Sequence, residues 1–105
     1  NVNADTMAAA LAVRLKASRL LIAGTTPGVL DGEGNTIAEL GFHAERALAS
    51  AGTINRGMLA KLQACRAAIA GGVPEVAIVD GRDTARLRAA LAGRDGAVES
   101  MTRVI

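Results

Sequence analysis

The amino-acid sequence predicts an α/β fold, in which a parallel sheet is covered on both faces and carries one β-hairpin. Segments with helical periodicity alternate with short apolar runs along the 105 residues. These apolar runs are continuous, as is typical of strands that are buried on both faces of a parallel sheet. No linker or internal repeat divides the chain, so we expect one compact domain.

The first element is a helix over residues 4–16. An apolar stripe at i, i+4 and i+8 predicts it, formed by Met7, Leu11 and Leu15. Asn3 stands just before this stripe, in a capping position. The continuous apolar run 20–23 follows and predicts a buried strand, which ends at Gly24.

A β-hairpin is predicted next. The short segments 29–30 and 36–38 flank the turn-rich stretch 31–35, whose residues tolerate positive φ. The segment 42–51 then indicates a short helix that is closed by Gly52.

The clearest helical stripe of the chain consists of Met58, Leu62, Cys65 and Ile69. Asn55 can cap the start of this helix, and Gly71 and Gly72 supply the left-handed residues that end it. The remaining residues predict a buried strand over 76–79, a helix over 83–92 and a last strand over 102–105.

The composition excludes several classes of protein. Half of the residues are hydrophobic, which argues against disorder, and no uncharged apolar stretch reaches the roughly 18 residues of a membrane span. Phe42 is the only aromatic residue and the formal net charge is only +2, so neither base stacking nor a polybasic surface supports nucleic-acid binding. We therefore expect neither a nucleic acid nor a membrane as partner.

Cysteine usage indicates the compartment. Cys65 is the only cysteine, so we expect no disulfide, no cysteine-based metal site and a reducing, cytoplasmic location. His43 has no partner at metal-ligand spacing, so we interpret it as structural, and Cys65 as a small core residue. The sequence begins at Asn1 without an initiator Met, from which we expect a piece of a longer protein.

Two loops that follow predicted strands, 24–28 and 80–82, are candidate ligand sites, because ligands of such sheets bind beyond the carboxyl ends of the strands. The glycines and threonines of 24–28 would let N–H groups and hydroxyls approach a phosphate. A simple turn is the alternative interpretation. Neither a Walker nor a Rossmann glycine motif is present.

Two charged residues stand out among the helices. Asp5 lies in an opening turn, where the helix dipole favours it by about 0.3–1 kcal/mol, so capping alone would explain it. Lys61 also lies near the start of a helix, where a positive charge is disfavoured, and this cost indicates a use such as binding a phosphoryl group. A solvated surface lysine is the alternative.

Four segments, taken in order and with their spacing, resemble the C-terminal half of the acetylglutamate kinases in the amino acid kinase family: NVNADT, TTPGVLDGEGNTI, TINRGMLAKLQAC and VAIVDGR. The resemblance covers essentially the whole chain. It implies a three-layer αβα sandwich with a mainly parallel sheet. Residues 1–105 would form the ATP-binding half, and the N-terminal substrate-binding half would be absent.

The resemblance also implies roles for individual residues. Asn1 matches the asparagine that touches the amino-acid substrate, Asp5 the acidic residue that orients the catalytic lysines, and Lys61 the lysine that stabilises the transferring phosphoryl group. The nucleotide would be lined by Thr25, Thr26, Pro27, Gly28, Val29 and Leu30, and on its other side by Thr53, Ile54 and Asn55. The sequence departs from the family pattern at three positions: Thr25 replaces the usual Asp, and Lys16 and Met101 replace Gly.

The implied reaction transfers the γ-phosphoryl group of ATP, carried with Mg²⁺, to the γ-carboxylate of N-acetyl-L-glutamate, a step of arginine biosynthesis. The partners would be ATP and an N-acylated acidic amino acid, and we expect a homo-oligomer at full length. Alternatives are a kinase for N-acetyl- or carrier-linked aminoadipate in lysine biosynthesis, and a non-catalytic nucleotide-binding fragment. We expect the isolated chain to be inactive and marginally stable or self-associating, because half a sheet exposes a strand edge and an apolar surface.

Overall fold

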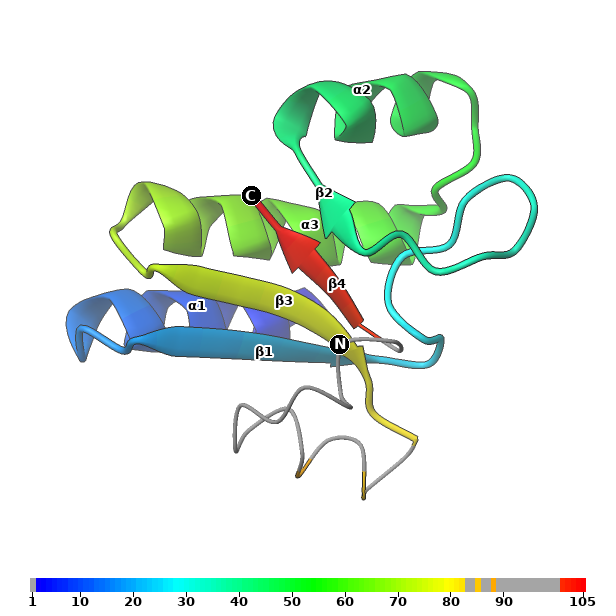
Figure 1. Ribbon diagram of the computed structural model, residues 1–105. Helices are drawn as coiled ribbons and strands as arrows, with labels where there is room; N and C mark the ends of the chain where they lie inside the picture. The colour runs from blue at the N-terminus through cyan, green and yellow to red at the C-terminus, as the bar shows by residue number, and fades with distance from the viewer. Residues whose placement is uncertain (1, 83–84, 86–87, 89–100) are drawn as a thin grey trace.

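The computed structural model describes residues 2–82, 85, 88 and 101–105. Figure 1 shows the elements, which in chain order are α1 (Val2–Arg14), β1 (Arg19–Gly24), β2 (Glu39–Leu40), α2 (Phe42–Ser50), α3 (Arg56–Ala70), β3 (Glu75–Asp80) and β4 (Met101–Val104). The helix predicted over 83–92 lies mostly outside the described residues.

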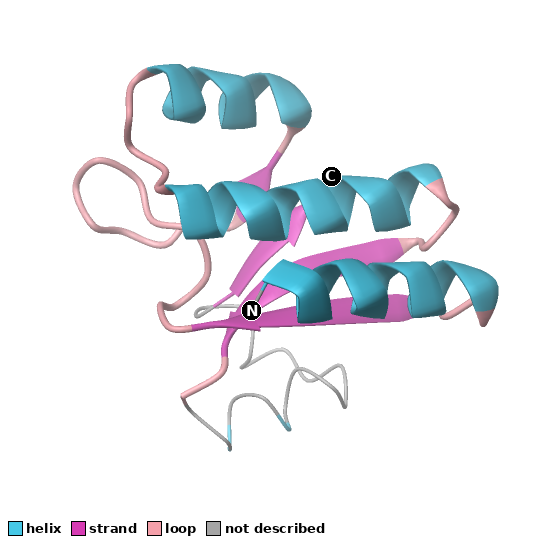
Figure 2. Cartoon of the chain, turned by 180° about the vertical axis from the view of Figure 1, so that it is seen from behind, coloured by secondary structure: helices cyan, strands magenta, loops and turns pink. Residues whose placement is uncertain are grey.

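The four strands form one mixed sheet in the order β1-β3-β4-β2. The pairs β1–β3 and β2–β4 are parallel, and β3–β4 is antiparallel. Figure 2 shows α1 and α3 side by side across one face of this sheet. The predicted α/β class and the mainly parallel character of the sheet are therefore confirmed.

The main core lies between the sheet and the helices α1 and α3. Its fully buried large side chains include Ile22, Leu62, Val76 and Ile78. Removing a side chain of this size from water stabilises the fold by about 1.5–3 kcal/mol. Because side chains alternate across a strand, Ala77 and Val79 form a second, smaller cluster with Leu21 and Met101 on the opposite face.

The strands β1 and β3 differ in their burial. β3 lies inside the sheet and is buried from Val76 to Asp80, as predicted. β1 is an edge strand, in which Leu20 and Leu21 are half-buried and Ala23 is exposed. The prediction that this run is buried on both faces was wrong: Ile22 packs into the main core, whereas Leu21 and Ala23 alternate with it and are less covered. An apolar run does not reveal how well each face of its strand is covered.

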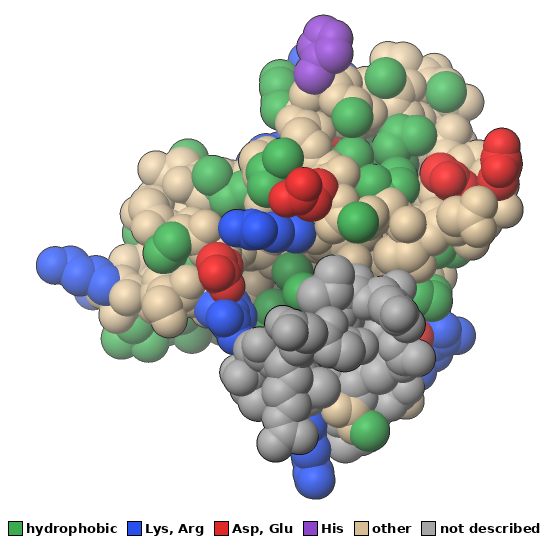
Figure 3. Space-filling view, viewed as in Figure 1, with side chains coloured by type: hydrophobic (Ala, Val, Ile, Leu, Met, Phe, Trp, Pro, Cys, Tyr) green, Lys and Arg blue, Asp and Glu red, His purple; other side chains and the backbone are tan. Residues whose placement is uncertain are grey.

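The sheet face turned away from α1 and α3 carries charges of both signs, and Figure 3 shows such side chains gathered over the strands. Arg19 Nε lies 2.8 Å from Glu75 Oε2, between the paired residues of β1 and β3. Arg103 and Glu39 form a looser pair across β4 and β2, at 3.8 Å. All four side chains are exposed, so the two pairs contribute little to stability.

The buried face of α1 is not the one that its large apolar residues mark. Met7, Leu11 and Leu15 are 53–75% exposed, whereas Ala9 and Ala12 are buried. Alanines let α1 approach α3 closely, because a small side chain fits where a leucine would hold the backbones apart. The stripe therefore predicted the helix correctly but lies on its outer side.

The predicted hairpin is reduced to its turn and one bridge. Leu30 and Thr36 form a single antiparallel bridge, and the Asp31 carboxylate accepts the backbone N–H groups of Glu33 and Asn35 at 2.9 and 3.0 Å. The strand expected over 36–38 is displaced to β2, whose partner is β4.

The ends of α1, α2 and α3 all use left-handed residues. Gly52 has φ of 75° just after α2, as expected for the residue that closes this helix. Lys16 has φ of 53° just after α1, and Gly72 has φ of 102° just after α3. Gly71 has φ of −82°, so the prediction that it is also left-handed was wrong. A single left-handed residue after the helix is enough to end it.

The helix α2 is joined to the sheet and to α3 through Arg66. The Arg66 guanidinium donates to the buried Glu45 carboxylate of α2 at 2.9 Å and to the Leu40 carbonyl at the end of β2 at 3.3 Å. It also donates to the Ile105 carbonyl after β4. None of the helices in the described part of the chain is long and apolar enough to cross a membrane.

Candidate active site

Asp5 and Lys61 form an ion pair between the two neighbouring helices. Asp5 lies in the first turn of α1, and Lys61 lies in the second turn of α3. Lys61 Nζ is 2.9 Å from Asp5 Oδ2, and the two side chains are only 17% and 12% exposed. The structure thus brings together two residues that the sequence marks separately, at positions 56 apart.

The Lys61 ammonium also lies at the carboxyl end of β1. It donates to the Ala23 carbonyl at 3.1 Å. An ammonium group has three donors, and within the described residues only these two contacts use them. A third N–H is therefore available to an anion. Because Asp5 and the Ala23 carbonyl hold the ammonium in place, they also determine where such an anion would bind.

In the candidate loop after β1, one of the two threonine hydroxyls forms a hydrogen bond within the loop. Thr26 Oγ1 donates to the Gly28 carbonyl at 2.7 Å, so this hydroxyl belongs to the turn itself. Gly28 has φ of 77° and Val29 is buried. Thr25 is exposed, which leaves it as the threonine of this loop whose side chain faces solvent.

The second predicted nucleotide segment leads directly into α3. Asn55 is the N-cap, and its Oδ1 accepts the Met58 N–H at 2.8 Å, which confirms the predicted cap. Ile54 is buried in the same cluster as Val29, so the two segments share the core beneath them. Thr53 is half-buried. The positive end of the α3 dipole lies at this point.

The loop after β3 is occupied by an internal ion pair. Arg82 Nε and Nη2 donate to the two carboxylate oxygens of Asp80 at 3.0 and 2.9 Å, and the Arg82 N–H donates to Oδ1 at 2.9 Å. The hydrogen bonds to this carboxylate, with its charge, raise the pKa of Arg82 above its ordinary value. In the sheet register Asp80 is the partner of Gly24, so the pair stands beside the candidate loop.

Three further residues from the sequence analysis are placed as follows. Asn1 lies outside the described residues, so its expected contact with the amino-acid substrate stays a prediction. His43 is exposed on α2. Cys65 is buried in α3, and burial is the main cause that raises the pKa of its thiol to about 12. Cys65 therefore behaves as the core residue that the sequence predicts.

Thr102 of β4 was not marked by the sequence analysis. Its side chain is completely buried and hydrogen-bonded to the loop after β1. No signal in the neighbouring residues marks it, because Thr102 stands between Met101 and the exposed Arg103 and its hydrogen-bond partner lies 73 residues away.

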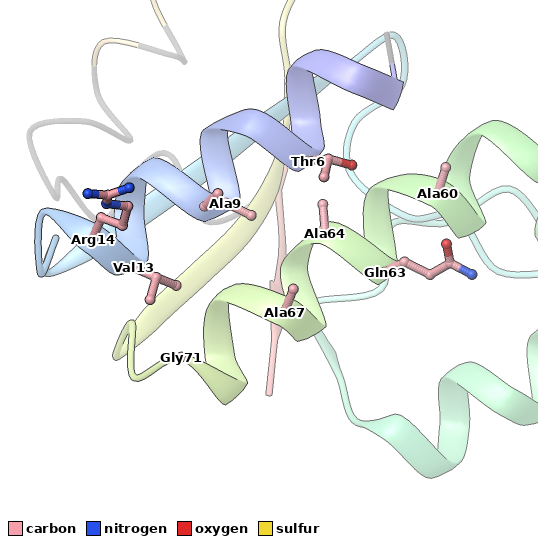
Figure 4. Close-up of a pocket in the computed structure, with 10 residues that line it drawn as sticks. Thr6, Ala9, Val13, Arg14, Ala60, Gln63, Ala64, Ala67 and Gly71 are labelled. Carbon is pink, nitrogen blue, oxygen red and sulfur yellow. The ribbon is translucent and has the colours of Figure 1, made fainter.

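A groove of about 540 Å³ lies between α1 and α3. Figure 4 shows its lining, which comes from both helices and consists mainly of small side chains with Thr6, Arg14 and Gln63 among them. Neither Asp5 nor Lys61 lines it. We interpret the groove as the open space above the contact of the two helices, which the small alanine side chains there do not fill. Within the part of the chain described, no group of three or more His, Cys, Asp or Glu side chains converges as a metal site.

Comparison with known proteins adds a family and several relatives. The model of the amino acid kinase family matches residues 1–80. The acetylglutamate kinase of Sinorhizobium fredii is 48% identical over 82 residues, which are 78% of this chain and 28% of that protein. The acetylglutamate kinase of Rhodospirillum rubrum is 46% identical over 82 residues, 78% of this chain and 26% of that protein. The chain thus spans little more than a quarter of these relatives.

Two solved structures resemble the fold. The smu.665 protein of Streptococcus mutans has a TM-score of 0.67 at 32% identity, over 74% of this chain and 31% of that one. The N-acetylglutamate synthase of Neisseria gonorrhoeae, in complex with coenzyme A and L-arginine, has a TM-score of 0.73 at 24% identity, over 95% of this chain and 22% of that one. At this identity the second likeness concerns the fold alone.

Proposed function

Because this chain belongs to the amino acid kinase family, we propose that it supplies the ATP-binding half of a kinase that phosphorylates the γ-carboxylate of N-acetyl-L-glutamate. The product would be an acyl phosphate in arginine biosynthesis, made in the cytoplasm. The curated relatives named above support this choice of acceptor.

The observation that carries the proposal is the position of the Lys61 ammonium. It lies at the carboxyl end of β1, where ligands of α/β sheets bind, and Asp5 and the Ala23 carbonyl hold it there. A held ammonium with one free N–H suits the charge of a phosphoryl group.

The chemistry requires little more than charge and alignment. The acceptor carboxylate has a pKa of about 4.3 and is ionised at neutral pH, so no general base is needed. Phosphoryl transfer then depends on bringing donor and acceptor into line and on offsetting the charge of the equatorial oxygens. Lys61 supplies that positive charge, and Asp5 orients Lys61 without accepting a proton.

The nucleotide would lie between the loop 25–30 and the segment 53–55. Both lead to Lys61, since the loop begins just after Ala23 and the segment ends at the first turn of α3. Exposed Thr25 and the N-terminus of α3 would face the phosphates, which suits anions because the first backbone N–H groups of a helix have no acceptor within the helix. Mg²⁺ would arrive with ATP and reduce the charge of its phosphates. Asn1 would contact the acceptor.

An acyl-phosphate assay on the complete gene product tests the proposal. Hydroxylamine trapping would compare N-acetylglutamate, N-acetyl-aminoadipate and a reaction without acceptor. We expect ATP-dependent product with N-acetylglutamate above all. Preference for the aminoadipate derivative would correct the acceptor, and ATP binding without product from either acceptor would contradict the kinase assignment.

A further inference from the structure

Thr102 connects the last strand to both sides of the loop after β1. Its Oγ1 accepts the Val29 N–H at 2.7 Å and donates to the Ile37 carbonyl at 2.6 Å. The side chain is 0% exposed, so water cannot replace either bond. One hydroxyl of β4 therefore fixes two backbone points that lie 73 and 65 residues away in the sequence.

Gly28 lies directly against Thr102. A Cβ added at Gly28 would stand 2.6 Å from Thr102 Oγ1 and 2.8 Å from the Thr102 nitrogen. Gly28 also has φ of 77°, a conformation that disfavours any side chain. The loop approaches β4 this closely only because glycine occupies the position.

Few contacts other than those of Thr102 attach the loop to β4. At the bridge between Leu30 and Thr36, two backbone bonds join its arms, from Ile37 N–H to the Val29 carbonyl and from Asp31 N–H to the Asn35 carbonyl. The Thr36 hydroxyl adds one side-chain bond, to the Pro27 carbonyl at 2.7 Å. An isolated two-stranded hairpin is at best marginally stable in water. Without the Thr102 hydroxyl, the buried Val29 N–H would lose its acceptor, and the loop would shift to find another.

We propose that Thr102 is a positioning residue for nucleotide binding, acting through the backbone of the loop 25–30. This inference rests on the proposed function of that loop. Thr102 itself touches no substrate. Because it acts on the nucleotide side and not on the Asp5–Lys61 pair, its loss should weaken nucleotide affinity more than acceptor affinity or kcat.

The test uses the complete gene product and three variants. Thr102→Val keeps the shape and removes the hydroxyl, and Thr102→Ser keeps the hydroxyl. Val104→Ala is the matched control, because Val104 is a buried residue of the same strand that contributes no side-chain bond to the loop. Each variant is assayed for KM of ATP, KM of the acceptor and kcat, and for amide hydrogen exchange in the peptide that contains Val29.

We expect Thr102→Val to raise the KM of ATP by about tenfold or more, with the acceptor KM changed by less than about twofold. Exchange at Val29 should become faster, while exchange in α3 stays as in the wild type. Thr102→Ser should restore the wild-type KM. Val104→Ala should lower the melting temperature without a selective change in the KM of ATP.

Several outcomes overturn the inference. One is an unchanged KM of ATP in Thr102→Val, and another is an equal rise in Val104→Ala, which would indicate a general effect of β4. If Thr102→Val does not fold, Thr102→Cys takes its place, because a thiol donates and accepts hydrogen bonds only weakly. A selective rise of the KM of ATP in Thr102→Cys, together with faster exchange at Val29, then supports the inference, and wild-type values for both contradict it. A wild type that neither binds nor uses ATP refutes the proposed function instead. Unchanged exchange at Val29 in Thr102→Val would then show, independently of nucleotide binding, that Thr102 does not position the loop.

Discussion

Lys61 of α3 and Asp5 of α1 are joined at 2.9 Å across the interface of two helices, in a position where both side chains are largely removed from water. An ion pair of this kind has a high desolvation cost, and breaking it leaves a poorly solvated charge. A leucine–alanine contact would hold the helices together at lower cost. The pair holds the Lys61 ammonium at the end of β1, and the first prediction follows from the proposed use of this ammonium in phosphoryl transfer.

Lys61→Ala should lower kcat by orders of magnitude in the complete gene product, with a smaller change in the KM of either substrate. The reason is that the charge which Lys61 offsets develops mainly during phosphoryl transfer, so its loss raises the barrier more than it weakens substrate binding. Steady-state kinetics with both substrates varied would measure this.

Lys16→Ala is the control for this prediction. Lys16 and Lys61 are the only lysines of the chain, and Lys16 is exposed after α1, so its removal should leave kcat unchanged. Asp5→Asn should give an intermediate loss, because the ammonium remains but is held less firmly. A near-normal kcat in Lys61→Ala would remove this residue from the mechanism.

The features that the sequence predicts well are those that neighbouring residues determine. The apolar spacing after Asn55, together with its side-chain cap, predicted α3 nearly to its ends, because both signals act within one or two turns. The buried face of α1 depends instead on its contact with α3, and the edge position of β1 depends on strand order. The apolar spacing around Leu11 does not show which face of α1 is buried, and the apolar run around Leu20 does not show that β1 is an edge strand.

The same distinction holds for the candidate site. Asp5 and Lys61 could each be marked from its own helix, because an acidic and a basic residue near the start of a helix differ in electrostatic cost. Their contact depends on how two helices pack, and only the family resemblance suggested it. Thr102 could not be found from its surroundings in the sequence, because its partners lie in distant segments of the chain.

Lys16→Gly should stabilise the 105-residue chain by about 0.5–1 kcal/mol, because Lys16 has a left-handed conformation that costs little only for glycine. Chemical denaturation at a fixed protein concentration would measure it. Lys16→Ala keeps a Cβ at the same φ and should give no such gain. Equal stabilities of all three proteins would mean that the helix end relaxes to another conformation.

Replacing leucine by alanine at two positions compares a buried side chain of α3 with the exposed stripe of α1. Leu62→Ala should lower the free energy of unfolding by about 2–5 kcal/mol, because Leu62 of α3 is completely buried. Leu11→Ala should change it by less than about 0.5 kcal/mol, because Leu11 is half exposed. The same variant should reduce self-association in analytical ultracentrifugation, since it removes part of an exposed apolar stripe. Equal losses of stability would show that Leu11 is covered.

Asn55→Ala should lower the free energy of unfolding by about 1 kcal/mol, because the Met58 N–H loses its side-chain acceptor at the start of α3. Asn55→Asp retains an acceptor oxygen and places a negative charge at the positive end of the helix dipole, so it should be as stable as the wild type or more so. Urea unfolding of the three proteins would measure the difference. A loss in Asn55→Asp equal to that in Asn55→Ala would contradict a capping role.

Cys65 makes the stability of the chain depend on pH in the alkaline range. Burial raises the pKa of its thiol from 9.0 to about 12. Below pH 9 the thiol is protonated in both states and contributes no pH dependence. Between pH 9 and about 12 the unfolded state loses this proton while the native state keeps it. The unfolded state then binds fewer protons, so the free energy of unfolding falls as pH rises, by up to about 1.4 kcal/mol per pH unit.

Cys65→Ala separates this effect from the titration of lysines in the same range. The variant loses packing and is less stable at neutral pH, so the slopes with pH are compared rather than the absolute stabilities. We expect the wild type to lose stability more steeply than Cys65→Ala above pH 9 and the two slopes to agree below it. At pH 8 a disulfide reagent should modify Cys65 only as fast as the chain opens, because the native thiol is buried and protonated. Parallel slopes above pH 9, or modification at the rate of a free thiol, would show that Cys65 is accessible to water in the native state.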